Sequence, residues 1–219
     1  MRIRNVLALF LALGVRSASA ETMVGLDLAV VIADGEVVFA DGFDDGVFGT
    51  PPWLGLGESP LNEAGTILDM PGDSVIVAPI VADPAELTLA WTLLELTSFS
   101  EGSLATMVLL GDDGGALYLG VVPGFAFLAD ATDGLIGLVP FPAAATVNLV
   151  LAVDDAGGAI ALANDEVVFA GDAGFGGVVS GIGVVVVPEP SGMLIVGIGL
   201  VACASRRISR SRRWRRTRH

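Results

Sequence analysis

Carboxylates are the only side chains between Glu21 and Val187 that carry a charge at neutral pH. The chain has 25 Asp and Glu residues, and all of them except Glu189 lie in this segment, which contains no Lys, Arg, His or Cys. That composition excludes Ser–His triads, Cys–His pairs, lysine Schiff bases and Cys/His zinc sites. Two kinds of chemistry remain: glycoside hydrolysis by paired carboxylates, and calcium binding by oxygen-rich loops.

The spacing of the carboxylates argues against hydrolysis. A glycosidase needs two carboxylates flanking the scissile bond, and jelly-roll β-glucanases usually place them as E-x-D-x-x-E on one strand. The nearest candidates, Glu86, Glu95 and Glu101, do not have that spacing. We therefore predict that the protein is not an enzyme, and a carboxylate glycoside hydrolase stays as a third hypothesis.

Three Asp-rich segments are candidate calcium loops, because calcium takes six to eight oxygen ligands. They contain Asp41, Asp44 and Asp45; Asp112 and Asp113; and Asp154 and Asp155. None matches the EF-hand loop, and Asp before Gly is also favourable turn chemistry. The first cluster has three carboxylates within five residues, so it is the site we predict if calcium is the cofactor.

A carbohydrate-binding module would use exposed aromatic rings. Trp53 and Trp91 are the only tryptophans between Glu21 and Val187. Trp53 lies in a Pro/Gly-rich loop and is the candidate stacking platform for a glycan. Trp91 alternates with core residues, so we predict that it is buried.

The elements that must position these residues are strands. Short apolar runs alternate with Asp/Gly turns, and no segment of the body indicates a helix. The predicted strands are Val24–Ala33, Glu36–Ala40, Ser74–Val81, Leu87–Phe99, Leu104–Leu110, Ala116–Val122, Phe125–Leu128, Leu135–Val139, Thr146–Val153, Ala159–Ala163, Glu166–Ala170 and Val178–Val187. This pattern predicts a single all-β sandwich of the jelly-roll kind, and the runs that are apolar at every position predict strands buried on both faces.

Two segments resemble known jelly rolls. Ala40-Asp41-Gly42-Phe43-Asp44-Asp45-Gly46, followed by Pro51-Pro52-Trp53, resembles the opening of concanavalin A-like or laminin G-like domains. The segment 147–169 resembles a hairpin of the same folds, with an Asn-Asp turn in place of Asn-Gly. Separately, Glu36–Ala40 recurs as Glu166–Ala170, which indicates two similarly placed strands or chance.

The N-terminus has the pattern of a secretory signal peptide. Arg2 and Arg4 form a positive n-region, and an apolar stretch follows that is too short to span a bilayer. Ala18-Ser19-Ala20 has the A-x-A form of a signal peptidase site, so we predict cleavage before Glu21.

The C-terminus combines a motif, an apolar run and a basic tail. Val187-Pro188-Glu189-Pro190-Ser191 precedes an apolar run that ends at Ala204, and Arg206 and Arg207 begin a tail with eight arginines. The prolines forbid a helix through Glu189, and the arginines would hold the tail in the cytoplasm as a membrane stop. Cys203, the only cysteine, lies in the apolar run.

This order of parts resembles the PEP-CTERM sorting signal of Gram-negative bacteria. The resemblance implies a transmembrane helix, cutting near Pro-Glu-Pro by the membrane protease-transpeptidase called exosortase, and release or attachment at the surface. A permanent single-pass anchor is the alternative. The chain then divides into a signal peptide at 1–20, an acidic β-sandwich ectodomain at 21–187, the motif and transmembrane helix at 188–205, and a cytoplasmic tail at 206–219.

The negative charge of the ectodomain limits what it can bind. The body carries 24 of the 25 carboxylates and no cation, which repels nucleic acid and anionic lipid. We predict an inner-membrane precursor that reaches the cell surface or extracellular matrix. The first functional hypothesis is a non-enzymatic structural or adhesive component associated with exopolysaccharide, and the second is a calcium-dependent carbohydrate-binding module.

Overall fold

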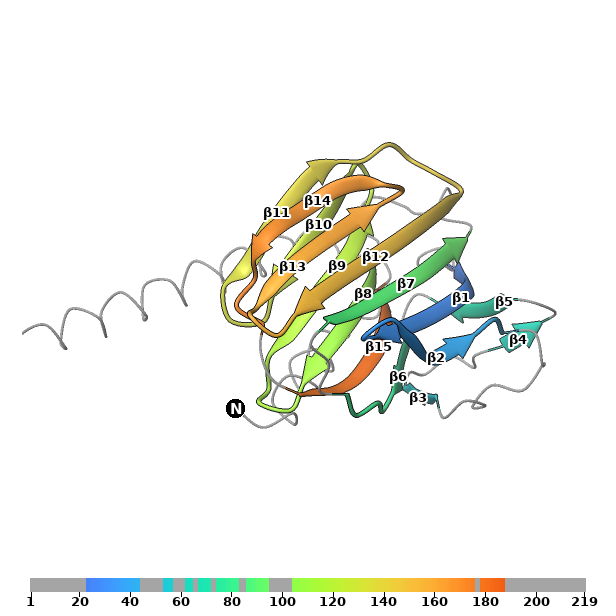
Figure 1. Cartoon of the computed structure of the whole chain (residues 1–219). Helices are drawn as coiled ribbons and strands as arrows, with labels where there is room; N and C mark the ends of the chain where they lie inside the picture. Colours follow the sequence, from blue (N-terminus) through green and yellow to red (C-terminus); the bar gives the residue numbers. More distant parts are fainter. Residues whose placement is uncertain are drawn as a thin grey trace, which may run out of the picture.

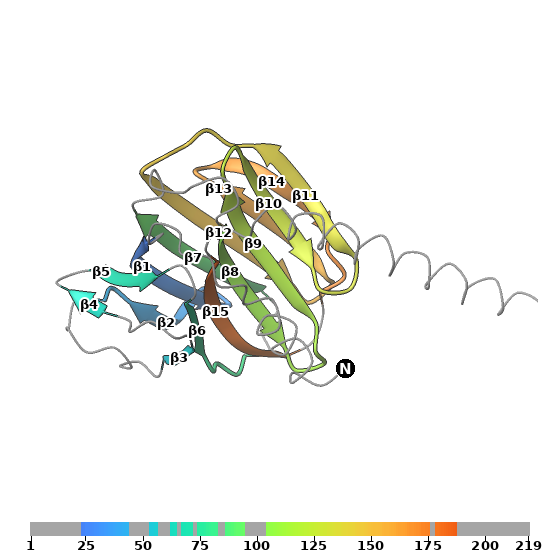
Figure 2. The ribbon, with the colours of Figure 1, turned by 180° about the vertical axis from the view of Figure 1, so that it is seen from behind.

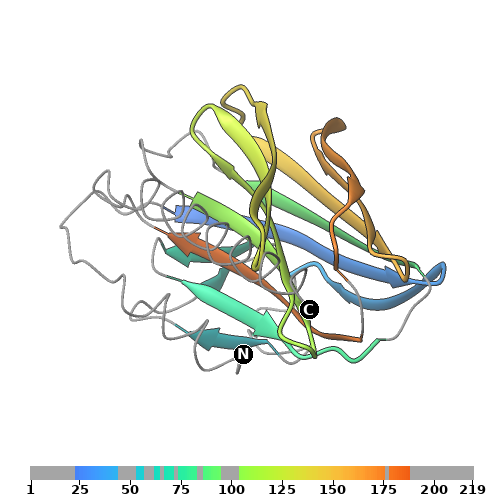
Figure 3. The ribbon, with the colours of Figure 1, turned by 90° about the vertical axis from the view of Figure 1, so that its left-hand side faces the viewer.

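The computed structural model describes residues 23–43, 53–56, 62–64, 67–71, 74–82, 86–94, 104–175 and 178–187. Every regular element in these ranges is a β-strand, and the strands form two layers (Figures 1 and 3). Their bounds are β1 Met23–Ala33, β2 Glu36–Asp41, β3 Leu54–Leu56, β4 Asn62–Ala64, β5 Ile67–Pro71, β6 Val75–Ala78, β7 Glu86–Leu94, β8 Leu104–Gly111, β9 Ala116–Val122, β10 Phe125–Asp130, β11 Gly134–Pro140, β12 Thr146–Asp154, β13 Gly158–Ala163, β14 Glu166–Asp172 and β15 Val179–Val187.

The two layers are antiparallel sheets. Sheet 1 has eight strands in the order β14-β13-β12-β7-β1-β5-β4, with β2 also paired to β1, and it faces the viewer in Figure 1. Sheet 2 has seven strands in the order β11-β10-β9-β8-β15-β6-β3, and Figure 2 shows it from the opposite side. The predicted all-β sandwich is therefore confirmed.

All twelve predicted strands are present, most with ends within two residues of the prediction. The clearest differences are at β6, which ends at Ala78 and not at Val81, and at β7, whose predicted continuation to Phe99 lies outside the described residues. Three short strands were not predicted: β3, β4 and β5. Each lies in a stretch where Gly, Pro and acidic residues interrupt the apolar pattern, so periodicity gave no signal there.

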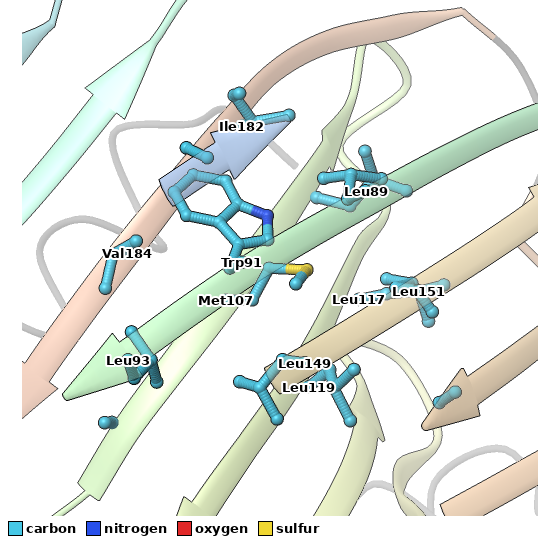
Figure 4. Close-up of a cluster of buried hydrophobic side chains, with 14 of the residues drawn as sticks. Leu89, Trp91, Leu93, Met107, Leu117, Leu119, Leu149, Leu151, Ile182 and Val184 are labelled. Carbon is cyan, nitrogen blue, oxygen red and sulfur yellow. The ribbon is translucent and has the colours of Figure 1, made fainter. Parts of the chain in front are cut away.

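The core lies between the sheets. Side chains from β7 and β12 of sheet 1 meet side chains from β8, β9 and β15 of sheet 2, as Figure 4 shows. Trp91 is among the largest fully buried side chains, which confirms its predicted place in the core. Strands β8 and β15 are buried at nearly every position, as expected for apolar runs in the middle of a sandwich.

Two hairpins of sheet 1 share a turn geometry. Asp34 and Gly35 connect β1 to β2 with φ angles of 49° and 81°, and Asn164 and Asp165 connect β13 to β14 with 46° and 66°. Positive φ at both central residues is the type I′ turn that matches the twist of a two-residue hairpin.

The same hairpins share a β-bulge, and this accounts for the repeated pentapeptide. In β2, Val38 is the extra residue between the pairs Val31–Phe39 and Ile32–Val37. In β14 the pairs Ala161–Phe169 and Leu162–Val167 leave the third residue of the pentapeptide extra in the same way. Glu36–Ala40 and Glu166–Ala170 are thus two similarly placed strands.

Candidate functional site

The segment predicted to bind calcium or glycan contains a hydrogen-bonded pair, Asp41 and Trp53. The indole Nε1–H of Trp53 donates to Asp41 Oδ2 at 2.7 Å, and the backbone N–H of Phe43 donates to Asp41 Oδ1 at 2.8 Å. Asp41 ends β2 and Trp53 precedes β3, so the carboxylate ties a strand of sheet 1 to the entry of a strand of sheet 2. The short separation of Asp41 and Trp53 in the sequence predicted that they lie in the same part of the fold, but not that they form a hydrogen bond.

Trp53 is buried, and this corrects the prediction of an exposed stacking ring. Its side chain is 4 % exposed, and its ring centroid lies 5.2 Å from Phe39, 6.0 Å from Phe43 and 5.7 Å from Trp91. These are ordinary edge-to-face and tilted aromatic contacts within a core. A ring covered in this way presents no face to a sugar, because stacking needs an open face.

The predicted calcium cluster is only partly within the described chain. Asp44 and Asp45 lie outside it, so their position relative to Asp41 is untested. Both oxygens of Asp41 already accept N–H groups, which gives this carboxylate a structural role in the turn and in seating Trp53. Within the described residues, no three Asp, Glu, His or Cys side chains converge as a metal site would require.

One Asp side chain in each of the other two predicted calcium segments organises a turn. Asp113 Oδ1 accepts the N–H of Gly115 at 2.8 Å. Asp154 Oδ1 accepts the N–H groups of Ala156 and Gly158 at 3.0 and 2.7 Å. These are the local bonds by which Asp stabilises a turn. Asp112 and Asp155 are exposed beside them.

Strand register brings together two carboxylates that the sequence did not pair. Glu86 begins β7 and lies directly opposite Asp154, the last residue of β12. Directly opposed side chains in an antiparallel pair have Cβ atoms about 4.5–5.5 Å apart. Both residues are exposed. Glu95 and Glu101, the other hydrolase candidates, lie outside the described residues.

Among the residues that the structure describes, the phenol of Tyr118 has a shifted pKa. Burial raises the pKa of the Tyr118 phenol above its usual value of 10.0, and the charge of nearby Asp130 raises it further. Asp130 is itself 8 % exposed and accepts the N–H groups of Thr132 and Asp133 at 2.6 and 2.7 Å. This carboxylate stabilises the turn between β10 and β11 and disfavours a second negative charge close by.

The junction between body and tail lies at the end of β15. This strand sits inside sheet 2, with Ile182 to Val185 paired to β6 and Val179 to Val187 paired to β8. The N–H of Val186 also donates to Ser74 O at 2.9 Å. Pro188 to Pro190 follow immediately, so the motif begins where the ladder ends.

Residues 186–213 match the family model of the PEP-CTERM protein-sorting motif. The C-terminal segment is a PEP-CTERM sorting signal. The match confirms the resemblance found in Val187 to Ser191 and in the Arg-rich tail that follows. The signal directs export to the cell surface and implies processing by exosortase.

Comparisons of the whole chain add little to this assignment. No curated protein matches it. Among solved structures, the cellulose-induced protein Cip1 is 12 % identical with a TM-score of 0.37, over 68 % of this chain and 88 % of that one. The binding domain of botulinum neurotoxin serotype G is 6 % identical with a TM-score of 0.31, over 82 % of this chain and 50 % of that one. Neither likeness assigns a function.

Several predictions at the two ends lie outside the described residues. These are the signal peptidase site at Ala18, Ala20 and Glu21, the apolar helix after Ser191, and the membrane stop at Arg206 and Arg207. Among the described residues, no helix is long and apolar enough to span a bilayer.

Proposed function

We propose that the exported body is a non-enzymatic structural or adhesive component of the cell surface or extracellular matrix, associated with exopolysaccharide. The observation that carries the proposal is the sorting signal, which begins directly after the last strand of the sandwich. A cut near Pro-Glu-Pro would leave both ladders of β15 intact, so the whole fold would be delivered.

The chemistry of the body supports a role without turnover. Asp113, Asp130 and Asp154 hold turns through backbone N–H groups, and Asp41 holds Trp53. The buried Trp53 also weighs against the second hypothesis, a carbohydrate-binding module that stacks a sugar on this ring. An acidic body without cations associates with a polysaccharide through hydroxyl contacts or through bridging cations, not by pairing with acidic sugars.

The test uses the full chain expressed in a host with exosortase, compared with a variant in which Pro188 and Pro190 are both alanine. We expect the native chain to reach the surface or matrix fraction and to sediment with the extracellular polysaccharide, and the variant to stay in the membrane fraction. A native protein that never leaves the membrane fraction would contradict the sorting step. An exported protein that stays in the supernatant, with calcium or with chelator, would contradict the polysaccharide association.

The hydrolase hypothesis is tested with the same exported protein. Shortening of the polysaccharide that disappears in Glu86→Gln would favour the hydrolase over the structural role, because Glu86 is the described carboxylate with an opposed partner. We expect no change in chain length with either protein.

A further inference from the structure

The outer face of sheet 1 carries two cross-strand rows of side chains that are apolar except for Thr88, and we call these rows the apolar band. The register of five strand pairs aligns them across β14, β13, β12, β7, β1 and β2, on the face seen in Figure 1. The first row is Val167, Leu162, Val150, Ala90, Val30 and Ala40; the second is Ala170, Ile160, Ala152, Thr88, Ile32 and Val37.

The band faces away from the core. Its members alternate with inward residues such as Leu89 and Leu151, which are fully buried. Several of its large side chains are more than half exposed: Val37 at 62 %, Val167 at 54 % and Ile160 at 51 %. Contiguous exposed apolar surface of this kind is uncommon on a soluble monomer and marks an interaction site.

The rows on either side of the band differ in charge. At one edge, Glu86 and Asp154 face each other across β7 and β12. At the other edge of the same two strands, Thr92 and Asn148 face each other, and Thr92 Oγ1 donates to Asn148 Oδ1 at 2.9 Å. In β7 and β12 the face therefore runs from carboxylates, through the two rows of the band, to a hydroxyl and an amide.

We propose that the apolar band is the interface of a symmetric dimer with a second copy of this chain, whose two-fold axis lies across the strands. This axis reverses the strand direction of the second copy. The first row of one copy therefore lies on the second row of the other. The Glu86–Asp154 row then faces the Thr92–Asn148 row of the partner, where an amide donor meets carboxylates. An axis along the strands would instead stack carboxylates on carboxylates, which a body without cations cannot neutralise.

The size of this surface is compatible with a second copy of the chain as the partner. The twelve positions of the two apolar rows and the four flanking positions on β7 and β12 each cover about 4.8 × 6.8 Å, which gives on the order of 500 Å² in projection. The corrugation of the side chains adds to this area, and a stable interface buries about 800 Å² per partner. The band contains no aromatic ring, so a sugar has nothing to stack on. Face-to-face packing of two sheets about 10 Å apart is a standard solution for such surfaces.

The experiment is sedimentation velocity on the exported protein, purified after expression of the full chain. We expect a dimer for the native protein and a monomer for Ile160→Asp combined with Val37→Asp, because two carboxylates would be buried in the interface. Leu138→Asp is the matched control: it is 52 % exposed on β11 of sheet 2, and this variant should stay a dimer. Circular dichroism must show the same folded spectrum for all three.

A single lysine tests the direction of the axis. Asn148→Lys places a cation opposite the partner's carboxylate row. We therefore expect the dissociation constant of the dimer to fall about tenfold at low salt. Thr132→Lys, which makes the same change in net charge in an exposed turn of sheet 2, should have little effect. Tighter association with both lysines would overturn the proposed axis, as would weaker association with Asn148→Lys.

A native protein that is monomeric at tens of micromolar would overturn the dimer. Equal loss of the dimer in Leu138→Asp and in the band variant would also overturn it. A monomer that needs the band residues for sedimentation with polysaccharide would assign the band to that partner instead of a second copy.

Discussion

The carboxylate of Asp41 holds the indole of Trp53 in the core through a 2.7 Å hydrogen bond between the end of β2 and the start of β3. The same carboxylate accepts the N–H of Phe43, so one side chain stabilises both a turn and an aromatic contact between the sheets. We expect Asp41→Ala to lower the free energy of unfolding by about 1–3 kcal/mol, because it leaves a buried indole N–H without its acceptor.

Urea unfolding of the exported protein, followed by tryptophan fluorescence, measures this change. Trp53→Phe removes the N–H but keeps a ring, and a double-mutant cycle with Asp41→Ala should give a coupling energy above about 0.5 kcal/mol. Glu36→Gln, at an exposed position of the same strand, is the control and should change stability little. Additive effects of the two substitutions would contradict the bond.

The two type I′ hairpins have different residues at their second turn position, so these two residues can be exchanged. Asp165 has a φ of 66°, a conformation that costs a non-glycine residue free energy, and the equivalent residue of the other hairpin is Gly35. We expect Asp165→Gly to stabilise the fold by about 0.5–1 kcal/mol and Gly35→Asp to destabilise it by a similar amount.

The thermal unfolding midpoints of both single variants and of the double variant measure these two effects. A Cβ at Gly35 meets no atom within 4 Å, so its cost comes from the backbone and not from a clash. The double exchange should therefore return close to the native midpoint. A Gly35→Asp variant as stable as the native protein would argue against backbone strain as the cause.

Local patterns predicted the strands because apolar runs and Asp/Gly turns are both short-range signals. Alternation around Trp91 predicted its burial, and the largely apolar β8 and β15 predicted strands in the middle of a sandwich. The sorting signal was predictable for the same reason, since its motif, apolar run and arginines lie within about thirty residues.

What the sequence did not predict depends on register. Glu86 and Asp154 are 68 residues apart, and only the pairing of β7 with β12 places them opposite each other. The apolar band needs five such pairings. Trp53 was misplaced because a Pro/Gly loop usually lies at the surface, while here the bond to Asp41 and three aromatic neighbours favour burial.

Tyr118 should give the body a single alkaline transition. It is the only tyrosine, and the segment 21–187 has no Lys, Arg or Cys that titrates in the same range. Burial and Asp130 raise the pKa of the folded phenol above 10.0, so its contribution to stability is complete below pH 10. Above that pH the unfolded chain ionises first, and stability is lost as pH rises toward the folded pKa.

Unfolding midpoints in urea from pH 8 to pH 12 test this sign. Tyr118→Phe lacks the ionisable group, so its stability should stay nearly constant over the range in which the native protein weakens. Absorbance of the phenolate should appear above pH 10 in the native state. A native protein that gains stability above pH 10 would contradict a raised pKa.

The opposed carboxylates Glu86 and Asp154 repel each other across β7 and β12, in a body whose 24 carboxylates face no cation. We expect Glu86→Gln to raise the thermal midpoint at low ionic strength, and this gain to shrink as salt screens the native pair.

Glu166→Gln, which changes an exposed carboxylate at the start of β14, removes the same charge and is the control. If the repulsion is local, Glu86→Gln stabilises more than Glu166→Gln in dilute buffer and both converge in about 1 M salt, where the Debye length is roughly 3 Å. Equal gains from the two variants would show that only net charge matters, because a change in net charge acts on the whole body and does not depend on the cross-strand partner.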